Sequence, residues 1–133
     1  MSDEKEILQK LVVDEKDTIK DLERLVTESS KFFKIEKPTG KIIFVSFGDL
    51  SDPKRICIVM IGKYFANKLG IVESPSLGIS DIAKEIGRPM TALSGPMKEL
   101  TKNGYVEKLP GRKYRIAYHR ISEILEKFLV SKK

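Results

Sequence analysis

Glycines and prolines divide the middle of this chain into segments whose lengths allow few folds. Gly70, Gly87 and Gly104 each follow a run of helix-forming residues, and Pro110-Gly111 interrupts a run that alternates apolar and polar residues. Glycine ends helices because it adopts left-handed backbone angles without strain, and a Pro-Gly pair favours a tight turn between strands. This punctuation predicts three helices followed by a short β-hairpin.

The first of these helices is expected to be the most buried. It should run from Pro53 to about Leu69, with Asp52 as its N-cap and the proline at the first helical position. Its apolar side chains form a stripe broad enough for a scaffold helix. They are Ile56, Ile58, Val59, Met60, Ile61, Tyr64 and Phe65.

Two shorter helices follow in close succession. The first is expected to begin at its N-cap Ser80 and to end at Gly87, with isoleucines facing inward. The second, over residues 90–103, keeps an apolar stripe although Gly95 and Pro96 lie within it. A proline inside a helix removes an N–H donor and clashes with the preceding turn, so this helix is expected to be bent or to start late. The stripe consists of Leu93, Met97 and Leu100.

The hairpin is expected to pair residues 105–108 with residues 113–117 around a type II turn centred on Pro110 and Gly111. Alternation along the second strand turns Tyr114 and Ile116 inward and the basic side chains outward. An amphipathic helix from about Ile121 to Leu129 then completes the chain.

Residues 1–50 are expected to form an N-terminal extension to a domain of residues 51–133. Residues 3–35 lack glycine and proline and predict one long helix or two collinear ones, and residues 41–47 predict a strand with no identified partner. The apolar stripe of the helix either joins two copies as a dimerisation seam or packs along its own domain. Its heptad pattern is interrupted, which makes a continuous coiled coil doubtful. The stripe consists of Leu8, Leu11, Leu22, Leu25 and Phe32.

The net charge of +6 is concentrated in one part of the chain. Residues 1–53 hold 9 basic and 12 acidic side chains, whereas residues 54–133 hold 16 and 7, so the second part carries +9. A basic module attached to an acidic segment is typical of proteins that bind polyanions, although lysine-rich surfaces also serve solubility. The charge indicates nucleic acid as one partner class.

The order of elements carries a family resemblance. The stretch SDIAKEIGRPMTALSGPMKELTKNGYVEKLPGRKYRI resembles the core of the winged helix-turn-helix transcription regulators of archaea and bacteria, and the likeness covers about residues 53–117. It implies a mainly α fold with a small β-hairpin, in which helix 90–103 enters the major groove of double-stranded DNA and the hairpin, the wing, follows the phosphate backbone. The wing is basic, and the helix presents small residues and then lysines. The DNA-binding residues expected on this basis are Lys84, Arg88, Thr91, Ser94, Gly95, Lys98, Lys102, Lys108, Arg112, Lys113 and Arg115.

Family members often carry a larger polar or basic residue where this chain has Gly95, which reduces the expected base recognition. The resulting hypothesis is a cytoplasmic homodimer that binds DNA with full or partial sequence specificity and regulates transcription, its two copies addressing half-sites about 10 base pairs apart. The main alternative is a winged helix that docks proteins in a larger assembly through its N-terminal helix. Single-stranded nucleic acid or RNA is a weaker alternative because few aromatic side chains are expected outside the core.

Other functional classes lack a signal in the sequence. Cys57 and His119 are the only cysteine and histidine, so no metal or disulfide is expected, and no catalytic set or phosphate loop occurs. The N-terminus lacks a signal-peptide pattern, and no apolar run is long enough for a membrane span. We therefore expect no enzyme activity, no cofactor and no membrane partner.

Overall fold

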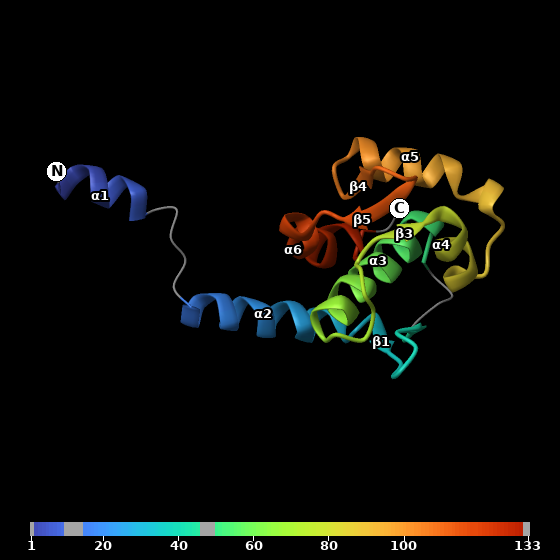
Figure 1. Cartoon of the computed structure of the whole chain (residues 1–133), viewed down its shortest axis with the longest axis horizontal. Coiled ribbons are helices and arrows are strands. Elements are labelled where there is room, and N and C mark those ends of the chain that lie inside the picture. The colour runs from blue at the N-terminus through green and yellow to red at the C-terminus, as the bar shows by residue number, and fades with distance from the viewer. Residues whose placement is uncertain (1, 10–14, 46–49, 132–133) are drawn as a thin grey trace.

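A computed structural model describes residues 2–9, 15–45 and 50–131 of the protein (Figure 1). Over these ranges the chain forms a small mixed α/β domain of helices and two small antiparallel sheets. None of the helices in the described ranges is long and apolar enough to cross a membrane. In chain order the elements are α1 (Ser2–Gln9), α2 (Glu15–Ser29), β1 (Phe33–Ile35), β2 (Ile42–Phe44), α3 (Asp52–Lys68), β3 (Leu77–Gly78), α4 (Ile79–Ile86), η1 (Met90–Ala92), α5 (Ser94–Lys102), β4 (Val106–Leu109), β5 (Lys113–Ile116), η2 (Tyr118–Arg120), α6 (Ile121–Glu123) and η3 (Ile124–Phe128).

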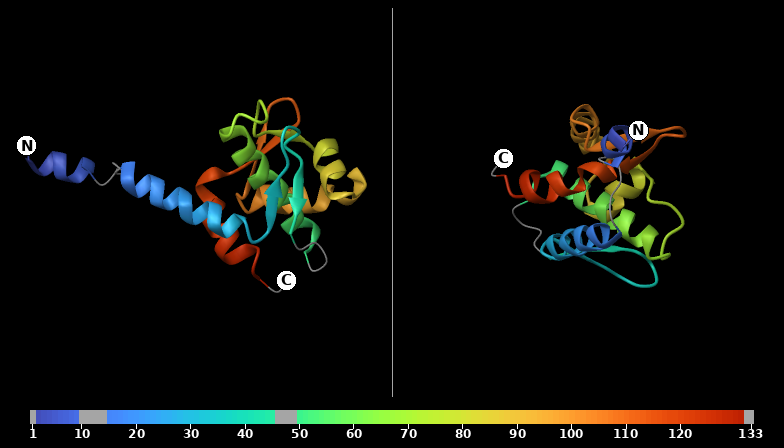
Figure 2. Two further views of the ribbon diagram at one scale, coloured as in Figure 1. Left: turned by 90° about the horizontal axis from the view of Figure 1, so that it is seen from below. Right: turned by 90° about the vertical axis from the view of Figure 1, so that its left-hand side faces the viewer.

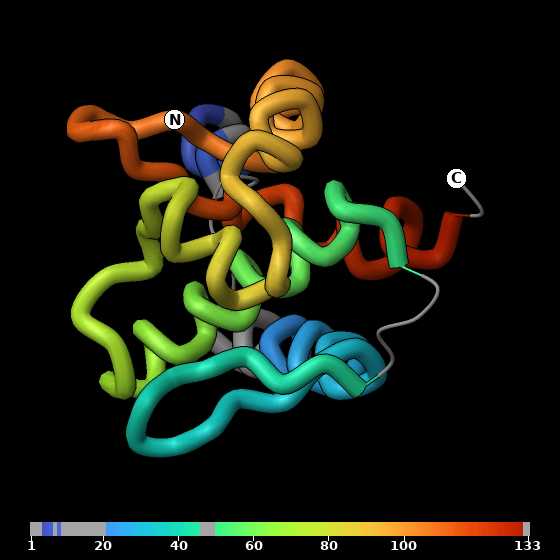
Figure 3. Tube along the Cα trace, turned by 90° about the vertical axis from the view of Figure 1, so that its right-hand side faces the viewer, coloured from blue at the N-terminus to red at the C-terminus, as the bar shows by residue number. Residues whose placement is uncertain are grey.

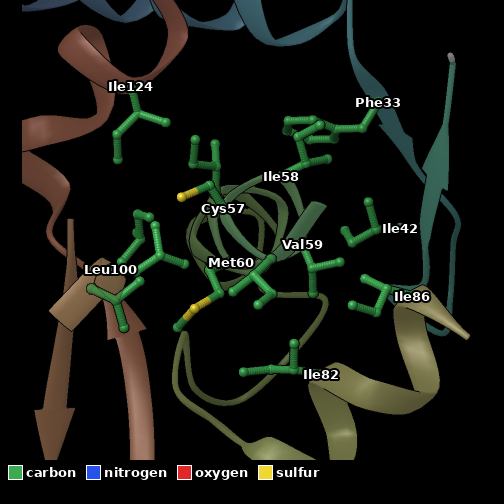
Figure 4. Close-up of a cluster of buried hydrophobic side chains, with 14 of the residues drawn as sticks. Phe33, Ile42, Cys57, Ile58, Val59, Met60, Ile82, Ile86, Leu100 and Ile124 are labelled. Atoms are coloured by element: carbon green, nitrogen blue, oxygen red, sulfur yellow. The ribbon is translucent and has the colours of Figure 1, made fainter. Parts of the chain in front are cut away.

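Helix α3 lies at the centre of the core, as the sequence predicts. Six consecutive residues, 56–61, have no exposed surface, so this helix is buried on every side over that stretch. Figure 4 shows side chains from five other parts of the chain pointing at it. Those labelled there are Phe33 of β1, Ile42 of β2, Ile82 and Ile86 of α4, Leu100 of α5 and Ile124 of η3.

The predicted N-terminal helix ends six residues earlier than expected. α2 stops at Ser29, and Phe33–Ile35 is a strand; α1 and α2 are described as separate helices, and residues 10–14 between them lie outside the described ranges. The Ser30 hydroxyl donates to the carbonyl of Thr27 at 2.7 Å, which gives the backbone an alternative to helix continuation. The aromatic and β-branched residues that follow then pair as a strand.

β1 is the pairing partner of the strand predicted at residues 41–47, which the sequence did not identify. Residues 46–49 lie outside the described ranges, and β2 covers Ile42–Phe44, paired antiparallel with β1 in the register Phe33↔Phe44 and Ile35↔Ile42. Phe33 and Ile42 are 4% and 2% exposed and belong to the same apolar cluster as α3. The expected boundary at residue 50 therefore runs through a shared core.

A buried ion pair fastens this hairpin to the helices. Lys63 Nζ lies 2.8 Å from Glu85 Oε1 and donates to the Gly40 carbonyl at 2.9 Å, while Glu85 Oε2 accepts the Ile42 amide at 3.2 Å. Lys63 is only 6% exposed. A buried charge needs such partners to offset its desolvation, so the pair fixes how β2, α3 and α4 meet.

Both expected N-caps are displaced in the structure. Ser51 is the N-cap of α3 and Asp52 is already helical; Gly78 is the N-cap of α4, so Ser80 lies inside that helix. Neither cap residue makes a side-chain capping bond. Asp52 instead bonds a distant arginine, and β3 holds Gly78 extended, so tertiary contacts decide both boundaries.

A three-stranded sheet, with strand order β3-β5-β4, closes the fold. β4 and β5 form the expected hairpin within one residue of its predicted ends, with pairs from Val106↔Ile116 to Leu109↔Lys113. β3 was not predicted, because two residues are too short to show alternation. The C-terminal segment is helical as expected, although its last five residues form a π-helix.

The close approach of β2 to α3 should make Gly62 intolerant of a side chain. A Cβ there would lie 2.3 Å from Ile42 Cδ1 and 3.4 Å from Phe33. We expect Gly62→Val to lower the free energy of unfolding by about 1–3 kcal/mol through overpacking, measured by urea denaturation. Gly95→Val is the matched control, because no atom lies within 4 Å of a Cβ there. Equal stability of the two variants would contradict the described packing.

Candidate nucleic-acid interface

Helix α5 accommodates Gly95 and Pro96 by starting late. It begins at Ser94, after the 3₁₀ turn η1, so both residues lie in its first turn. The first amides of a helix have no partner within the helix, so a proline there removes no bond. Of the two geometries left open by the sequence, a late start is the one observed.

The outward face of α5 meets the β4–β5 hairpin along a groove. A cavity of about 590 Å³ is lined by polar and basic side chains over an apolar floor. The lining residues are Ile79, Ser94, Met97, Lys98, Thr101, Lys102, Lys108 and Tyr114. We call this cavity the α5–hairpin groove. It brings together four of the eleven expected DNA-binding residues, namely Ser94, Lys98, Lys102 and Lys108.

The three lysines of this groove are available to an external anion. Lys98, Lys102 and Lys108 are all exposed, and none takes part in an ion pair among the described residues. Three like charges beside one cavity raise its positive potential and favour phosphate or carboxylate ligands. The remaining two residues of the expected α5 face, Thr91 and Gly95, are exposed near its start.

The four cations expected to share the hairpin lie on different faces. Lys108 is opposite Tyr114 on the face toward α5, whereas Lys113 and Arg115 point to the other face. Arg112 lies at the tip, with a positive φ of 60° directly after Gly111 at 78°. A non-glycine residue costs about 1–2 kcal/mol in this left-handed region, so the tip holds its arginine in a strained backbone.

Two of the expected arginines already have carboxylate partners. Arg115 Nε lies 2.9 Å from Glu107 Oε1, directly across the hairpin, and Arg88 Nε lies 3.3 Å from Asp52 Oδ2. Lys84 lines a separate cavity with Lys63 and Glu85, away from the α5–hairpin groove. The structure thus places Arg88 and Lys84 outside the basic groove.

Sequence reasoning missed two polar groups of the groove. Thr101 lies three residues after Lys98 and seven after Ser94, so a helical projection could have placed it on the same face; its hydroxyl donates to the Met97 carbonyl at 2.7 Å. Tyr114 packs against the core as predicted, but it is half-buried and also lines the groove beside Lys108. Its position depends on the strand register, which the sequence did not give.

A cluster beside the end of α5 ties the hairpin to the C-terminal helix. Glu123 Oε2 accepts the Tyr105 hydroxyl at 2.8 Å and Arg120 Nη2 at 2.7 Å, and the Arg120 guanidinium lies 4.8 Å from the Tyr105 ring centre. Arg120 Nη1 also donates to the Asn103 carbonyl at 3.4 Å. Hydrogen bonds from Arg120 and then Tyr105 lower the pKa of Glu123, and the bond to Glu123 raises the pKa of Tyr105.

The expected dimerisation seam is divided between two environments. Leu25 and Phe32 pack against their own core, whereas Leu8 and Leu22 are 54% and 49% exposed; Leu11 lies outside the described residues. Arg24 explains this orientation of α2, because it forms an ion pair with Glu126 near the C-terminus and bonds Ser122 at 3.1 Å. Leu25 and Phe32 therefore fit a stripe that packs along its own domain, whereas Leu8 and Leu22 are exposed and available for a dimerisation seam.

The described residues include no group of three or more His, Cys, Asp or Glu side chains that could hold a metal ion. In comparisons with known proteins, no family model, no curated protein and no solved structure matches the chain. The class defined by fold and site is therefore a small mixed α/β domain with a basic groove between a helix and a hairpin.

Glu123 should stabilise the fold in a pH-dependent way. Because folding lowers its pKa, its contribution is complete above the unfolded-state pKa and is lost as the pH falls through the lower folded-state value. We expect Glu123→Gln to lower the urea midpoint at pH 7 and the difference from wild type to shrink below about pH 4. Glu99→Gln is the control, since Glu99 is exposed and forms no ion pair in the described part of the chain. A difference that persists unchanged at acid pH would contradict this role.

Proposed function

We propose that this protein binds double-stranded DNA through α5 and the β4–β5 hairpin, as a winged helix-turn-helix domain. Support comes from the order of elements after residue 51: the core helix α3, the strand β3, the helix pair α4 and α5, and a hairpin that completes the sheet. Figure 3 shows α5 and the hairpin side by side at one edge of the domain, away from the N-terminal strands.

The observation that carries the proposal is the convergence of Lys98, Lys102 and Lys108 with Ser94 on one groove. The three ammonium groups come from two elements, the helix and the hairpin, so their meeting is a property of the fold. A row of unpaired cations with a hydroxyl donor suits the sugar-phosphate backbone. An α-helix also fits the major groove of B-DNA, which is about 12 Å wide.

The hairpin adds a second set of phosphate contacts. Arg112 at the tip and Lys113 on its outer face are exposed and form no ion pair in the described ranges. Arg115 and Arg88 can join them, because an exposed ion pair contributes only about 0–1 kcal/mol and a phosphate can replace the carboxylate. The hairpin would then follow the backbone beside the groove entered by α5.

The composition of α5 favours partial over strict sequence specificity. Its sequence, SGPMKELTK, contains no arginine, asparagine or glutamine, whose planar groups match two atoms of one base edge, and its two lysines are flexible point charges with weaker geometric selectivity. Serine, threonine and lysine mainly contact phosphates, and the hydrogen bonds that they form to base edges discriminate less between bases. We therefore propose semi-specific binding that regulates transcription by occupying promoter DNA as a homodimer.

Removing the three groove lysines should weaken binding in a salt-dependent way. Each phosphate neutralised contributes about 0.9 to the slope of log K against log salt, so Lys98→Ala, Lys102→Ala and Lys108→Ala together should lower the slope by up to about 2.7. Fluorescence anisotropy with a mixed-sequence duplex, over a series of salt concentrations, measures both affinity and slope.

The control for this variant changes three exposed lysines elsewhere. Lys37→Ala, Lys41→Ala and Lys127→Ala alter the net charge equally but lie outside the α5–hairpin groove. We expect this control to keep a slope close to that of wild type. An equal loss of affinity and slope in both variants would mean that binding depends on net charge alone. An absence of binding by wild type at low salt would refute the proposed function.

A substitution at Gly95 should affect the stability of the fold and the affinity for DNA in opposite directions. Apart from its chain neighbours and its own helix backbone, no atom lies within 4 Å of the position that a Cβ would take there, so Gly95→Ala should stabilise the protein by about 0.4–1 kcal/mol by reducing the freedom of the unfolded chain. If its bare backbone approaches DNA closely, the same change should weaken DNA affinity several-fold. Thermal unfolding and anisotropy on one sample test both effects, and higher stability with unchanged affinity would show that Gly95 does not contact DNA.

A further inference from the structure

An apolar surface groove lies on the other side of the molecule from the α5–hairpin groove. A cavity of about 450 Å³ runs between α2, β1 and the end of α3, and we call it the α2 groove. Its exposed rim includes Leu22 at 49%, Val26 at 49% and Leu69 at 64%. Large exposed apolar side chains grouped in this way mark an interaction site. The full lining is Leu22, Val26, Ser29, Ser30, Phe33, Lys34, Ile35, Phe65, Lys68 and Leu69.

Helix α1 carries a large apolar side chain that is exposed. In Figures 1 and 2 it stands clear of the domain beyond the far end of α2, and its Leu8 is 54% exposed. It has eight residues, whereas isolated helices shorter than about 12 residues are marginal in water. A stable α1 therefore requires a surface to pack against.

The charges of α1 and the α2 groove are complementary. α1 carries the exposed carboxylates of Glu4 and Glu6 against one exposed lysine, Lys5. The α2 groove has Lys34 and Lys68 in its lining and no acidic residue. An apolar floor with cationic edges suits an acidic amphipathic helix.

We infer that the α2 groove of one copy holds helix α1 of a second copy, with Leu8 inserted beside Val26 and Leu69. The exchange is reciprocal, as a two-fold axis requires, so each copy gives one helix and receives one. The α1 carboxylates then face Lys34 and Lys68. This inference names the interface of the homodimer, and it rests on the proposed function because the homodimer is part of that proposal.

The direction of the chain favours exchange over folding back. α2 leads outward from the domain, and α1 lies still farther out, so the helix is displayed away from its own groove (Figure 1). To cover its own groove, α1 would have to return along α2 past Leu22. A second molecule offers the same surface without that reversal.

Sedimentation equilibrium of the full chain tests the dimer without DNA. We expect a species of twice the 15.1 kDa chain mass, and at least about tenfold weaker dimerisation in Leu8→Asn and in Val26→Asn, because each buries an unpaired amide. Val45→Asn is the matched control: Val45 is 54% exposed but outside the α2 groove, so this variant should dimerise as wild type does. A monomeric wild type, or a dimer that neither substitution weakens, would overturn the inference.

Disulfide trapping distinguishes the two copies. Cys57 has no exposed surface, and burial raises the pKa of its thiol, so it does not compete with introduced thiols. Leu8→Cys protein mixed with Leu69→Cys protein should form a disulfide-linked heterodimer under mild oxidation. A double variant that closes its disulfide within a monomer would show α1 in its own groove and would refute the exchange.

These outcomes are independent of DNA binding. A chain that binds DNA in a salt-dependent way but sediments as a monomer would disprove the exchanged interface and leave the proposed DNA-binding surface intact. A dimer weakened by Leu8→Asn that binds no duplex at low salt would support the exchanged interface and refute the proposed function.

Discussion

The all-round burial of α3 determines the arrangement of the rest of this small domain. A helix with six successive buried residues cannot lie on a surface, so other elements have to cover each of its sides. β1 and β2 cover one side, α4 the next, and α5 with the β4–β5 hairpin and the C-terminal helical segment the remainder (Figure 4). The buried pair of Lys63 and Glu85 adds directional contacts to this apolar packing, because both carboxylate oxygens and the ammonium group are occupied across three elements.

Patterns confined to one element were readable from the sequence, and contacts between elements were not. The apolar stripe of α5 and the turn at Pro110-Gly111 depend on local periodicity and backbone preference, so they could be predicted. The strand Phe33–Ile35 could not, because no glycine or proline separates it from α2 and only pairing with β2 decides between helix and strand. The N-cap predictions were wrong for the same reason. Asp52 has a side chain suited to capping, but its carboxylate is paired with Arg88.

The candidate site shows the same division. Helical projection placed Ser94, Lys98 and Lys102 on one face, and the groove contains all three. The strand register assigns Lys108 to this groove and Arg115 to the opposite face beside Glu107, so the basic side chains expected on the hairpin form two separate sets. For the proposed DNA-binding function, one set would accompany the helix in the major groove and the other would meet the flanking backbone.

The separation of the two grooves determines how association and DNA binding can coexist. The α5–hairpin groove and the α2 groove share no lining residue, and Figure 3 shows α2 and α5 at opposite edges of the domain. A dimer formed through the α2 groove would leave both basic grooves exposed. The acidic N-terminal segment would then be held beside Lys34 and Lys68, on the side away from the DNA, where its carboxylates do not repel phosphate. The charge asymmetry along the chain thus fits the two proposals together: an acidic segment for the proposed association and a basic surface for the proposed DNA binding.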